Sequence, residues 1–287
     1  MKRAQVCYRV YCSSDWHNPP DRLKESVRAF IQEARKGQRE ALEKGQRVMV
    51  VGVGDLFELM LDGWASFIDA PAIHRLIEEL GDLEFVYLAG NHDPLPWIEE
   101  VMVRSGQQMR PLPGFGLELE GARYYFHHGH RWDMRARWIR VFTPLLMWLG
   151  SRGWLRGFLR WWTERMNPGG LKARVKRLEA ERDSQPRGSD EWARLSRMLE
   201  GERQRYNERI GWVHAGAGKH AEITGRVVIC GHTHKPWRAA GFEGPTPVLC
   251  VHDDGDLVDS FTYLVIDASG VKLHTLGELQ GARPAAR

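Results

Sequence analysis

Short apolar stretches and longer amphipathic stretches alternate over the first part of the chain. Residues 5–12 alternate loosely between apolar and polar side chains, as a strand does, and "RVMVVGVGD" predicts a buried strand that ends at Gly54 and Asp55. Between them, apolar residues recur at helical spacing and predict a helix over 21–43. A second helix is predicted over 72–80. The chain therefore begins as alternating strands and helices.

Three more predicted strands follow, and each ends in polar side chains. They contain "LEFVYLAGNHD" at 83–93, "ARYYFHHGH" at 122–130 and "GRVVICGHTH" at 225–234. Strands that alternate with helices predict an α/β fold. Open α/β sheets place their sites at the carboxyl ends of the strands, where these polar side chains stand.

The composition changes in the middle of the chain. Residues 132–162 hold six of the twelve tryptophans, and 171–210 predicts a charged helical hairpin that breaks at "SQPRGSD". We therefore predict a core formed by 1–134 and 222–287. An inserted helical subdomain at 135–221 would interrupt it, as a lid or as a membrane-facing element.

The overall composition is that of a globular protein. Of the 287 residues, 43% are hydrophobic and 27% are charged, which is ordinary for a globular protein. A chain of this length can bury a substantial core. The four cysteines show no disulfide-like spacing, which favours reduced thiols in a cytoplasmic compartment. No signal peptide is recognisable, and no apolar stretch reaches the roughly 18 residues of a membrane span. We expect a cytoplasmic protein.

The charge is unevenly distributed along the chain. The net charge is +4, yet basic residues outnumber acidic ones two to one between Arg131 and Lys219. The remainder of the chain is therefore acidic. This asymmetry indicates an acidic face around a cation site and a separate basic element that faces anionic partners.

The polar strand ends form a set of five motifs. In chain order they are Asp15 with His17, Gly54–Asp55, "GNHD" at 90–93, "HHGH" at 127–130 and "GHTH" at 231–234. Each has a structural explanation by itself, as a helix cap or a turn. Their joint occurrence at predicted strand ends indicates one shared site instead.

The residue types of these motifs suit metal ions. Carboxylates, imidazoles and an amide oxygen are ligands for Mn²⁺, Mg²⁺, Fe or Zn²⁺ rather than for copper or an iron–sulfur cluster. Two ions about 3.5–4 Å apart need a bridging ligand, which a carboxylate such as Asp55 can supply. Such a pair binds a hydroxide at neutral pH and clamps the oxygens of a phosphoryl group. We expect two divalent ions, with Mn²⁺ first among these four.

The order D-x-H, GD, GNHD, HGH, GHTH resembles the calcineurin-like metallophosphoesterase superfamily, over roughly residues 5–134 and 222–270. The resemblance implies a sandwich of two mixed sheets flanked by helices, and hydrolysis by a metal-bound hydroxide that attacks phosphorus in line. His92 matches the histidine that lies over the phosphate, which stabilises charge or protonates the leaving group and is oriented by a neighbouring carboxylate. We expect His92, Asp55 and Asn91 to be catalytic. The implied ligands are Asp15, His17 and His234 on one metal, Asn91, His128 and His232 on the other, and Asp55 as the bridge.

Two histidines compete for one ligand position. Both His127 and His128 precede Gly129, and strand alternation lets only one of them face the site. The family pattern uses the histidine directly before the glycine, so we predict His128. His130 is a candidate substrate contact near the mouth of the site.

The substrate class has to come from other features. The protein phosphatase branch of the superfamily usually shows GDxxDRG, whereas this chain has "GDLFELM", with Glu58 in place of an aspartate. "GDLFEL", "CGHTHKP" and "GDLVDSFTYLV" resemble the branch that includes UDP-2,3-diacylglucosamine pyrophosphatase of bacterial lipid A synthesis. That branch implies a peripheral membrane enzyme which cleaves a pyrophosphate. In it an arginine often follows the asparagine of the third motif, where this chain has His92.

The insert carries a basic, aromatic-rich helix. Along "SRGWLRGFLRWW", Arg152, Arg156 and Arg160 form one cationic stripe beside an apolar face rich in tryptophan. Such a helix can rest on the inner face of an anionic membrane or line an acyl-chain groove. It can also pack on the core, as most amphipathic helices do. We predict that these three arginines contact substrate.

Other functions stay open. A phosphodiesterase or nucleotidase for soluble nucleotides would use the arginines to bind phosphates. A nuclease would combine arginine and tryptophan to hold single strands, although we rank nucleic acid below small phosphorylated or lipid substrates. A non-catalytic metal-binding scaffold is a further alternative, against which the retained His92 argues. The hairpin at 171–210 is a candidate oligomer contact.

Overall fold

The computed structural model describes residues 8–133, 168–240, 250–253, 257 and 260–276. The chain divides into two compact units, which are described separately below. One consists of Met1–Gly129 with Ala217–Arg287, and the other is His130–Gly216. The predicted assignment of an insert over 135–221 as a lid or membrane-facing subdomain stays a prediction.

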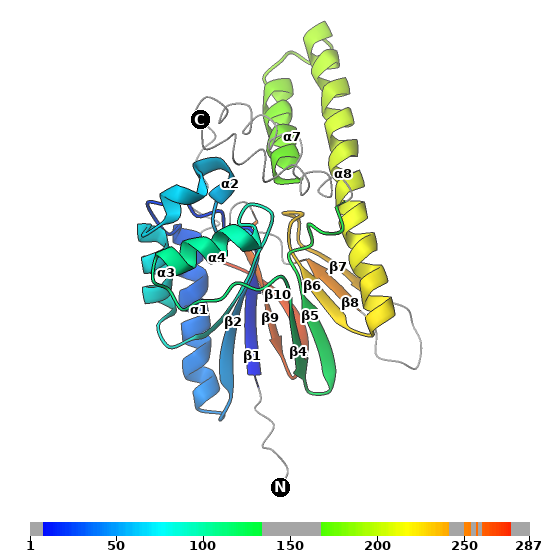
Figure 1. The fold of residues 1–287 in the computed structure, drawn as a ribbon. Coiled ribbons are helices and arrows are strands. Elements are labelled where there is room, and N and C mark those ends of the chain that lie inside the picture. Colours follow the sequence, from blue (N-terminus) through cyan, green and yellow to red (C-terminus); the bar gives the residue numbers. More distant parts are fainter. Residues whose placement is uncertain (1–7, 134–167, 241–249, 254–256, 258–259, 277–287) are drawn as a thin grey trace. The chain divides into compact units, whose positions relative to one another are not determined.

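The first sheet of the larger unit contains the first three strands of the chain. Its order is β10-β9-β1-β2-β3, and β1 pairs in parallel with β2, as β2 does with β3 (Figure 1). Parallel neighbours end at the same edge of a sheet, so the loops after β1, β2 and β3 lie together. The strands are β1 (Tyr8–Ser13), β2 (Arg47–Val53), β3 (Glu84–Leu88), β9 (Thr262–Asp267) and β10 (Gly270–Thr275).

The second sheet has the order β4-β5-β6-β8-β7. Its middle strands β5, β6 and β8 are parallel, whereas the edge strands β4 and β7 are antiparallel to their neighbours. The loops after β5 and β6 therefore also leave from one edge. The strands are β4 (Phe115–Leu119), β5 (Ala122–Phe126), β6 (Val227–Cys230), β7 (Trp237–Ala240) and β8 (Cys250–Asp253).

Alternating side chains of β1 and β2 supply two separate cores. Val10 and Val51 belong to an apolar cluster that also contains Phe126 and Ile229 of the second sheet, so the two sheets pack face to face. Val50, one residue away, belongs to the cluster on the opposite face. Both faces of the first sheet are thus buried, which explains the continuous apolar run of "VMVV".

Helices cover the outer face of the first sheet. Helices α1 and α3 lie on this side of the sheet (Figure 1). Their side chains Phe30 and Ile73 are fully buried in the same cluster as Val50. The predicted sandwich of two sheets with flanking helices is therefore confirmed. The helical segments are α1 (Glu25–Leu42), α2 (Leu59–Asp62), η1 (Trp64–Phe67), α3 (Pro71–Leu80) and α4 (Leu95–Arg104).

The prediction that the first helix begins at Asp21 is wrong by four residues. The buried Asn18 side chain accepts a hydrogen bond from the Lys24 N–H (2.9 Å) and donates one to the Leu56 carbonyl (2.9 Å). These contacts hold the segment before Glu25 as a loop. The helix can begin only where that loop ends.

The smaller unit contains a helical hairpin. Its helices are α7 (Pro168–Asp183) and α8 (Asp190–Thr224), and α8 continues past the unit boundary into the larger unit. The hairpin was predicted to end at 210, and this is wrong because α8 continues to Thr224. Leu178, Leu195 and Leu199 form the buried contact between the two helices. Among the described residues, no helix combines the length and apolarity needed to cross a bilayer.

Candidate metal centre

The five motifs meet at one edge of the larger unit. Their loops follow β1, β2, β3, β5 and β6, the strands whose parallel pairing was described above. Among the described residues, three groups of side chains have ligand atoms within 4.8 Å of one another. These groups are Asp15 with His17 and His234, His17 with Asp55 and His92, and Asp55 with His128 and His232.

The first group is built around Asp15. Its carboxylate is fully buried, and Oδ1 lies 3.2 Å from His234 Nε2 and 3.8 Å from His17 Nε2. Oδ1 accepts no hydrogen bond, which is costly for a buried charged atom. The second oxygen accepts from Ser14 Oγ and from the His232 N–H. A cation between Oδ1 and the two imidazoles would remove that cost, so the first group fits a metal ion.

The third group is built around His128, whose tautomer follows from its contacts. Nδ1 lies 2.9 Å from the Val53 carbonyl, which can only accept, so Nδ1 carries the proton. Nε2 then presents a lone pair, yet it faces Asp55 Oδ2 and Asn91 Oδ1, both at 3.1 Å. An imidazole nitrogen, a carboxylate oxygen and an amide oxygen converge there, and this is a ligand set that suits a cation. Either a second proton or a metal ion would supply the positive charge.

Glu58 joins two of the imidazoles. One carboxylate oxygen lies 2.6 Å from His92 Nδ1 and the other lies 2.9 Å from His17 Nδ1. The two rings are perpendicular, with centroids 4.7 Å apart. Because Glu58 contacts both rings at Nδ1, it fixes the orientation of both imidazoles. Glu58 is therefore the carboxylate beside His92 that the family resemblance implied without naming it.

Neighbouring imidazoles and carboxylates in these groups shift one another's pKa values. Burial alone would lower the pKa of His92, but the carboxylates of Glu58 and Asp55 outweigh it and raise that pKa to about 9. Burial likewise opposes charge on His128, and Asp55 and Asp15 raise its pKa to about 10. Burial would raise the pKa of Glu58, yet His92 and His17 lower it to about 2. The carboxylates around His92 thus favour its protonated form.

Five of the motif residues have a backbone conformation that is unusual for side chains larger than glycine. Their φ values lie between 47° and 74°, in the left-handed region. This conformation costs about 1–2 kcal/mol for each residue. Hydrogen bonds from the Asp15 N–H to the Gly54 carbonyl (3.0 Å) and from the His17 N–H to the Asp55 carbonyl (2.9 Å) help to hold it. The five residues are Asp15, His17, Asp55, His232 and His234.

Glycines let the motifs approach one another. A Cβ at Gly90 would lie 2.0 Å from Asp55 Oδ1, and one at Gly54 would lie 2.5 Å from His128 Cβ. A Cβ at Gly231 would lie 2.1 Å from Ser14 Oγ. In each case the glycine of one motif lies against a residue of another. The glycines directly before Asp55, Asn91 and His232 are therefore required by packing.

The structure brings together all eight predicted metal and catalytic side chains at these strand ends. His128 faces Asp55 and Asn91. His127 instead accepts a hydrogen bond from the Gly129 N–H (2.8 Å) at its Nδ1. His130 belongs to the smaller unit, so its role as a substrate contact stays a prediction. Arg152, Arg156 and Arg160 lie outside the described residues, and so does the tryptophan-rich face beside them.

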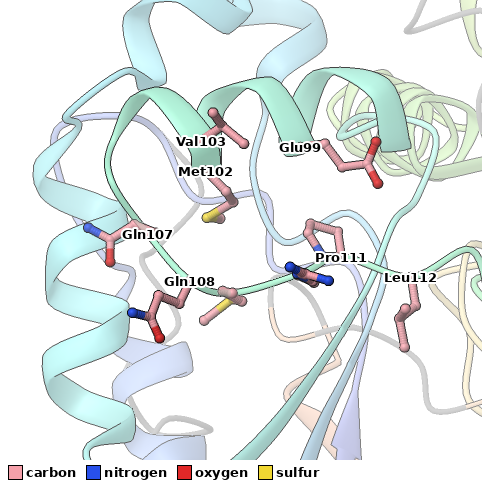
Figure 2. Close-up of a pocket in the computed structure, with 9 residues that line it drawn as sticks. Glu99, Met102, Val103, Gln107, Gln108, Pro111 and Leu112 are labelled. Atoms are coloured by element: carbon pink, nitrogen blue, oxygen red, sulfur yellow. The ribbon is translucent and has the colours of Figure 1, made fainter.

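A separate cavity of about 780 Å³ lies between α4 and the segment 107–112 (Figure 2). Met102 and Val103 of α4 line one wall, and Gln108 and Leu112 line the other. None of the metal-group residues lines it. This cavity is therefore distinct from the candidate metal centre.

Comparisons with known proteins agree with the motif pattern. A sequence-family model described as calcineurin-like phosphoesterase matches residues 8–236. No curated protein matches the chain. Similar solved structures include an archaeal phosphodiesterase, at 12% identity over 93% of this chain and 98% of that one, with a TM-score of 0.35.

Two further solved structures are similar over most of their length. An uncharacterised protein of Streptococcus pneumoniae, described as a predicted phosphoesterase, shows 13% identity over 94% of this chain and 99% of that one, with a TM-score of 0.28. A dimetal phosphatase of Danio rerio shows 8% identity over 95% and 100%, with a TM-score of 0.37. At such low TM-scores, the assignment to a family rests on the sequence match over most of the chain.

Proposed function

The chain belongs to the calcineurin-like phosphoesterase family, and from that premise we propose that it is a hydrolase of phosphoester or diphosphate bonds which works with two divalent metal ions. The observation that carries this proposal is the meeting of His128 Nε2 with two oxygen acceptors, Asp55 Oδ2 and Asn91 Oδ1, at 3.1 Å. That arrangement suits a cation. The family match indicates that the cation is a metal ion.

The ligand assignment draws on the three groups of side chains. Asp15, His17 and His234 would hold one ion, and Asn91, His128 and His232 the other, with Asp55 between them. Two bound ions supply Lewis-acid activation of water and neutralise the charge of the phosphoryl group. We propose Mn²⁺, with Mg²⁺, Fe or Zn²⁺ as alternatives that the same ligands accept.

His92 would supply the proton for the leaving group. Glu58 and Asp55 raise its pKa to about 9, which favours the protonated ring at neutral pH, and Glu58 holds the ring at Nδ1 (2.6 Å). A positioned acid of this kind contributes roughly 10²–10⁴ to the rate. The T-shaped contact with His17 places His92 beside the first group of ligands.

A lipid nucleotide sugar similar to UDP-diacylglucosamine is the substrate we propose. It is supported by the motif resemblance to that branch and by the apolar, basic composition of 152–162. The enzyme would then act in the cytoplasm, on or near the inner face of a membrane. A soluble nucleotide phosphodiester is the second candidate, favoured by the retained His92 in place of an arginine.

The catalytic proposal is tested with a simple phosphodiester. Mn²⁺-loaded protein should hydrolyse bis(p-nitrophenyl) phosphate, and Asp55→Ala or His232→Ala should abolish turnover because each removes a ligand. His74→Ala, on the exposed face of α3, is the matched control and should retain full activity. Undiminished turnover in both ligand variants would refute the mechanism.

The substrate proposal needs a competition assay. UDP-2,3-diacylglucosamine is offered beside UDP-glucose, cyclic nucleotides and single-stranded DNA, and kcat/KM is compared. The proposal predicts the highest value for the acylated sugar nucleotide. A preference for any non-acylated compound contradicts the lipid assignment, and it leaves the two-metal hydrolysis intact.

A further inference from the structure

Asp93, the last residue of the third motif, has no assigned role, yet its carboxylate is completely buried. It accepts hydrogen bonds from five donors. Two of them come from the strand and turn that precede it, namely Tyr87 Oη (2.6 Å) and the Gly90 N–H (2.6 Å). The other three are successive backbone N–H groups of the second motif, those of Asp55 (3.0 Å), Leu56 (2.7 Å) and Phe57 (3.3 Å).

The three backbone N–H groups converge on the Asp93 carboxylate. Successive N–H groups that converge in this way form an anion-binding concavity. Burial and the nearby Asp55 carboxylate raise the pKa of Asp93 to about 7. All five of its partners are donors, however, so the ionised form is the one that the surroundings accommodate. Asp93 thus fixes the backbone of the turn that begins at Asp55.

The link between the two motifs is reciprocal. The Asp55 N–H donates to Asp93 Oδ1 (3.0 Å), and the His92 N–H donates to Asp55 Oδ1 (2.7 Å). Gly90 lies so close to Asp55 that a methyl group would not fit between them. Asp55 is therefore held at two points. Asp93 accepts a hydrogen bond from its backbone N–H, and the His92 N–H donates one to its carboxylate.

We propose that Asp93 is a positioning residue, which holds the Asp55 turn so that the Asp55 carboxylate can bridge two metal ions. The proposal rests on the proposed function only through that bridging role. Asp93 belongs to none of the three ligand groups found among the described residues. It acts through the backbone of Asp55, Leu56 and Phe57, and its removal would let the bridging carboxylate shift.

The test compares Asp93→Asn with Tyr87→Phe. The asparagine amide turns one acceptor into a donor that faces backbone N–H groups, whereas Tyr87→Phe removes only the phenol donor and leaves the Asp55 turn intact. We measure Mn²⁺ affinity by calorimetry and the exchange coupling between two bound Mn²⁺ ions by electron paramagnetic resonance. We also measure the melting temperature of the metal-free proteins.

Asp93→Asn should bind Mn²⁺ about 10–100-fold more weakly, as is typical when a group that supports a ligand is lost. It should also lose the coupled signal, while Tyr87→Phe keeps both within about twofold. Native affinity and coupling in Asp93→Asn would overturn the proposal. An equal loss in Tyr87→Phe would also overturn it, because the effect would then not pass through the turn.

A second measurement needs no variant. The amide protons of Asp55, Leu56 and Phe57 should exchange slowly in the metal-free wild-type protein, because Asp93 accepts from all three. Fast exchange would refute the proposal even if Asp93→Asn does not fold. Failure of the wild-type protein to bind two Mn²⁺ ions would contradict the proposed function instead, and so the two failures are distinguishable.

Discussion

Some individual side chains at the site have roles that the sequence motifs do not reveal. The strand-end pattern predicted Asp55 and His92, because a carboxylate after a buried strand and an imidazole in "GNHD" are recognisable in one dimension. It assigned no role in the site to Glu58 or Asp93. Both act through contacts with residues more than 30 positions away in the chain, and such partners depend on how the loops fold back.

The shared contacts of Glu58 lead to a prediction about charge and geometry. Glu58→Gln should lower kcat about 10–100-fold, because one amide cannot accept from both His17 Nδ1 and His92 Nδ1. Steady-state kinetics with bis(p-nitrophenyl) phosphate gives the measurement. Glu100→Gln, which disrupts an exposed ion pair with Arg104, is the control and should leave kcat unchanged. An unaltered kcat in Glu58→Gln would show that the shared carboxylate is dispensable.

The close approach at Gly90 gives a second prediction. Gly90→Ala should lower the free energy of unfolding by about 1–3 kcal/mol, since its Cβ would overlap Asp55 Oδ1. Urea unfolding of the metal-free protein measures this loss. Gly116→Ala in β4 is the matched control, because its Cβ would meet nothing closer than 3.9 Å. Equal stability of the two variants would contradict the packing account of the motif glycines.

Secondary structure followed the sequence pattern where packing and propensity agree. Strands β2 and β6 were predicted because central parallel strands are apolar on both faces. The end of α8 was predicted wrongly, at 210. "GWVHAGAGKHAEIT" looks like a helix terminus because glycine disfavours helix, yet the helix continues to Thr224. Burial of Val213, Ala217 and Ala221 along this stretch overrides the low propensity.

The glycines of α8 therefore differ in what they do. Gly201→Ala should raise the free energy of unfolding by about 0.5–1 kcal/mol, because its Cβ would meet nothing within 4 Å. Gly216→Ala should lower it by about 1–3 kcal/mol, because its Cβ would lie 2.6 Å from Trp132 Cβ. Thermal unfolding of the two variants compares them directly. A shift of the same sign in both would refute this distinction.

Both sheets of the larger unit supply candidate ligands, so metal binding should stabilise the folded chain. Asp15 and Asp55 are buried carboxylates in one site, so the folded chain gains from any cation that binds there. Mn²⁺ at about 100 times its Kd should raise the free energy of unfolding by about 2.7 kcal/mol. Scanning calorimetry with Mn²⁺ and with EDTA measures the difference. Identical melting curves would contradict metal binding by the folded chain.

The most direct test of the dinuclear site is anomalous diffraction from crystals soaked in Mn²⁺. The account predicts two anomalous peaks about 3.5–4 Å apart. One should lie among Asp15, His17 and His234 and the other among Asn91, His128 and His232, with the Asp55 carboxylate between them. A single peak, or two peaks without Asp55 between them, would contradict a two-metal phosphoesterase.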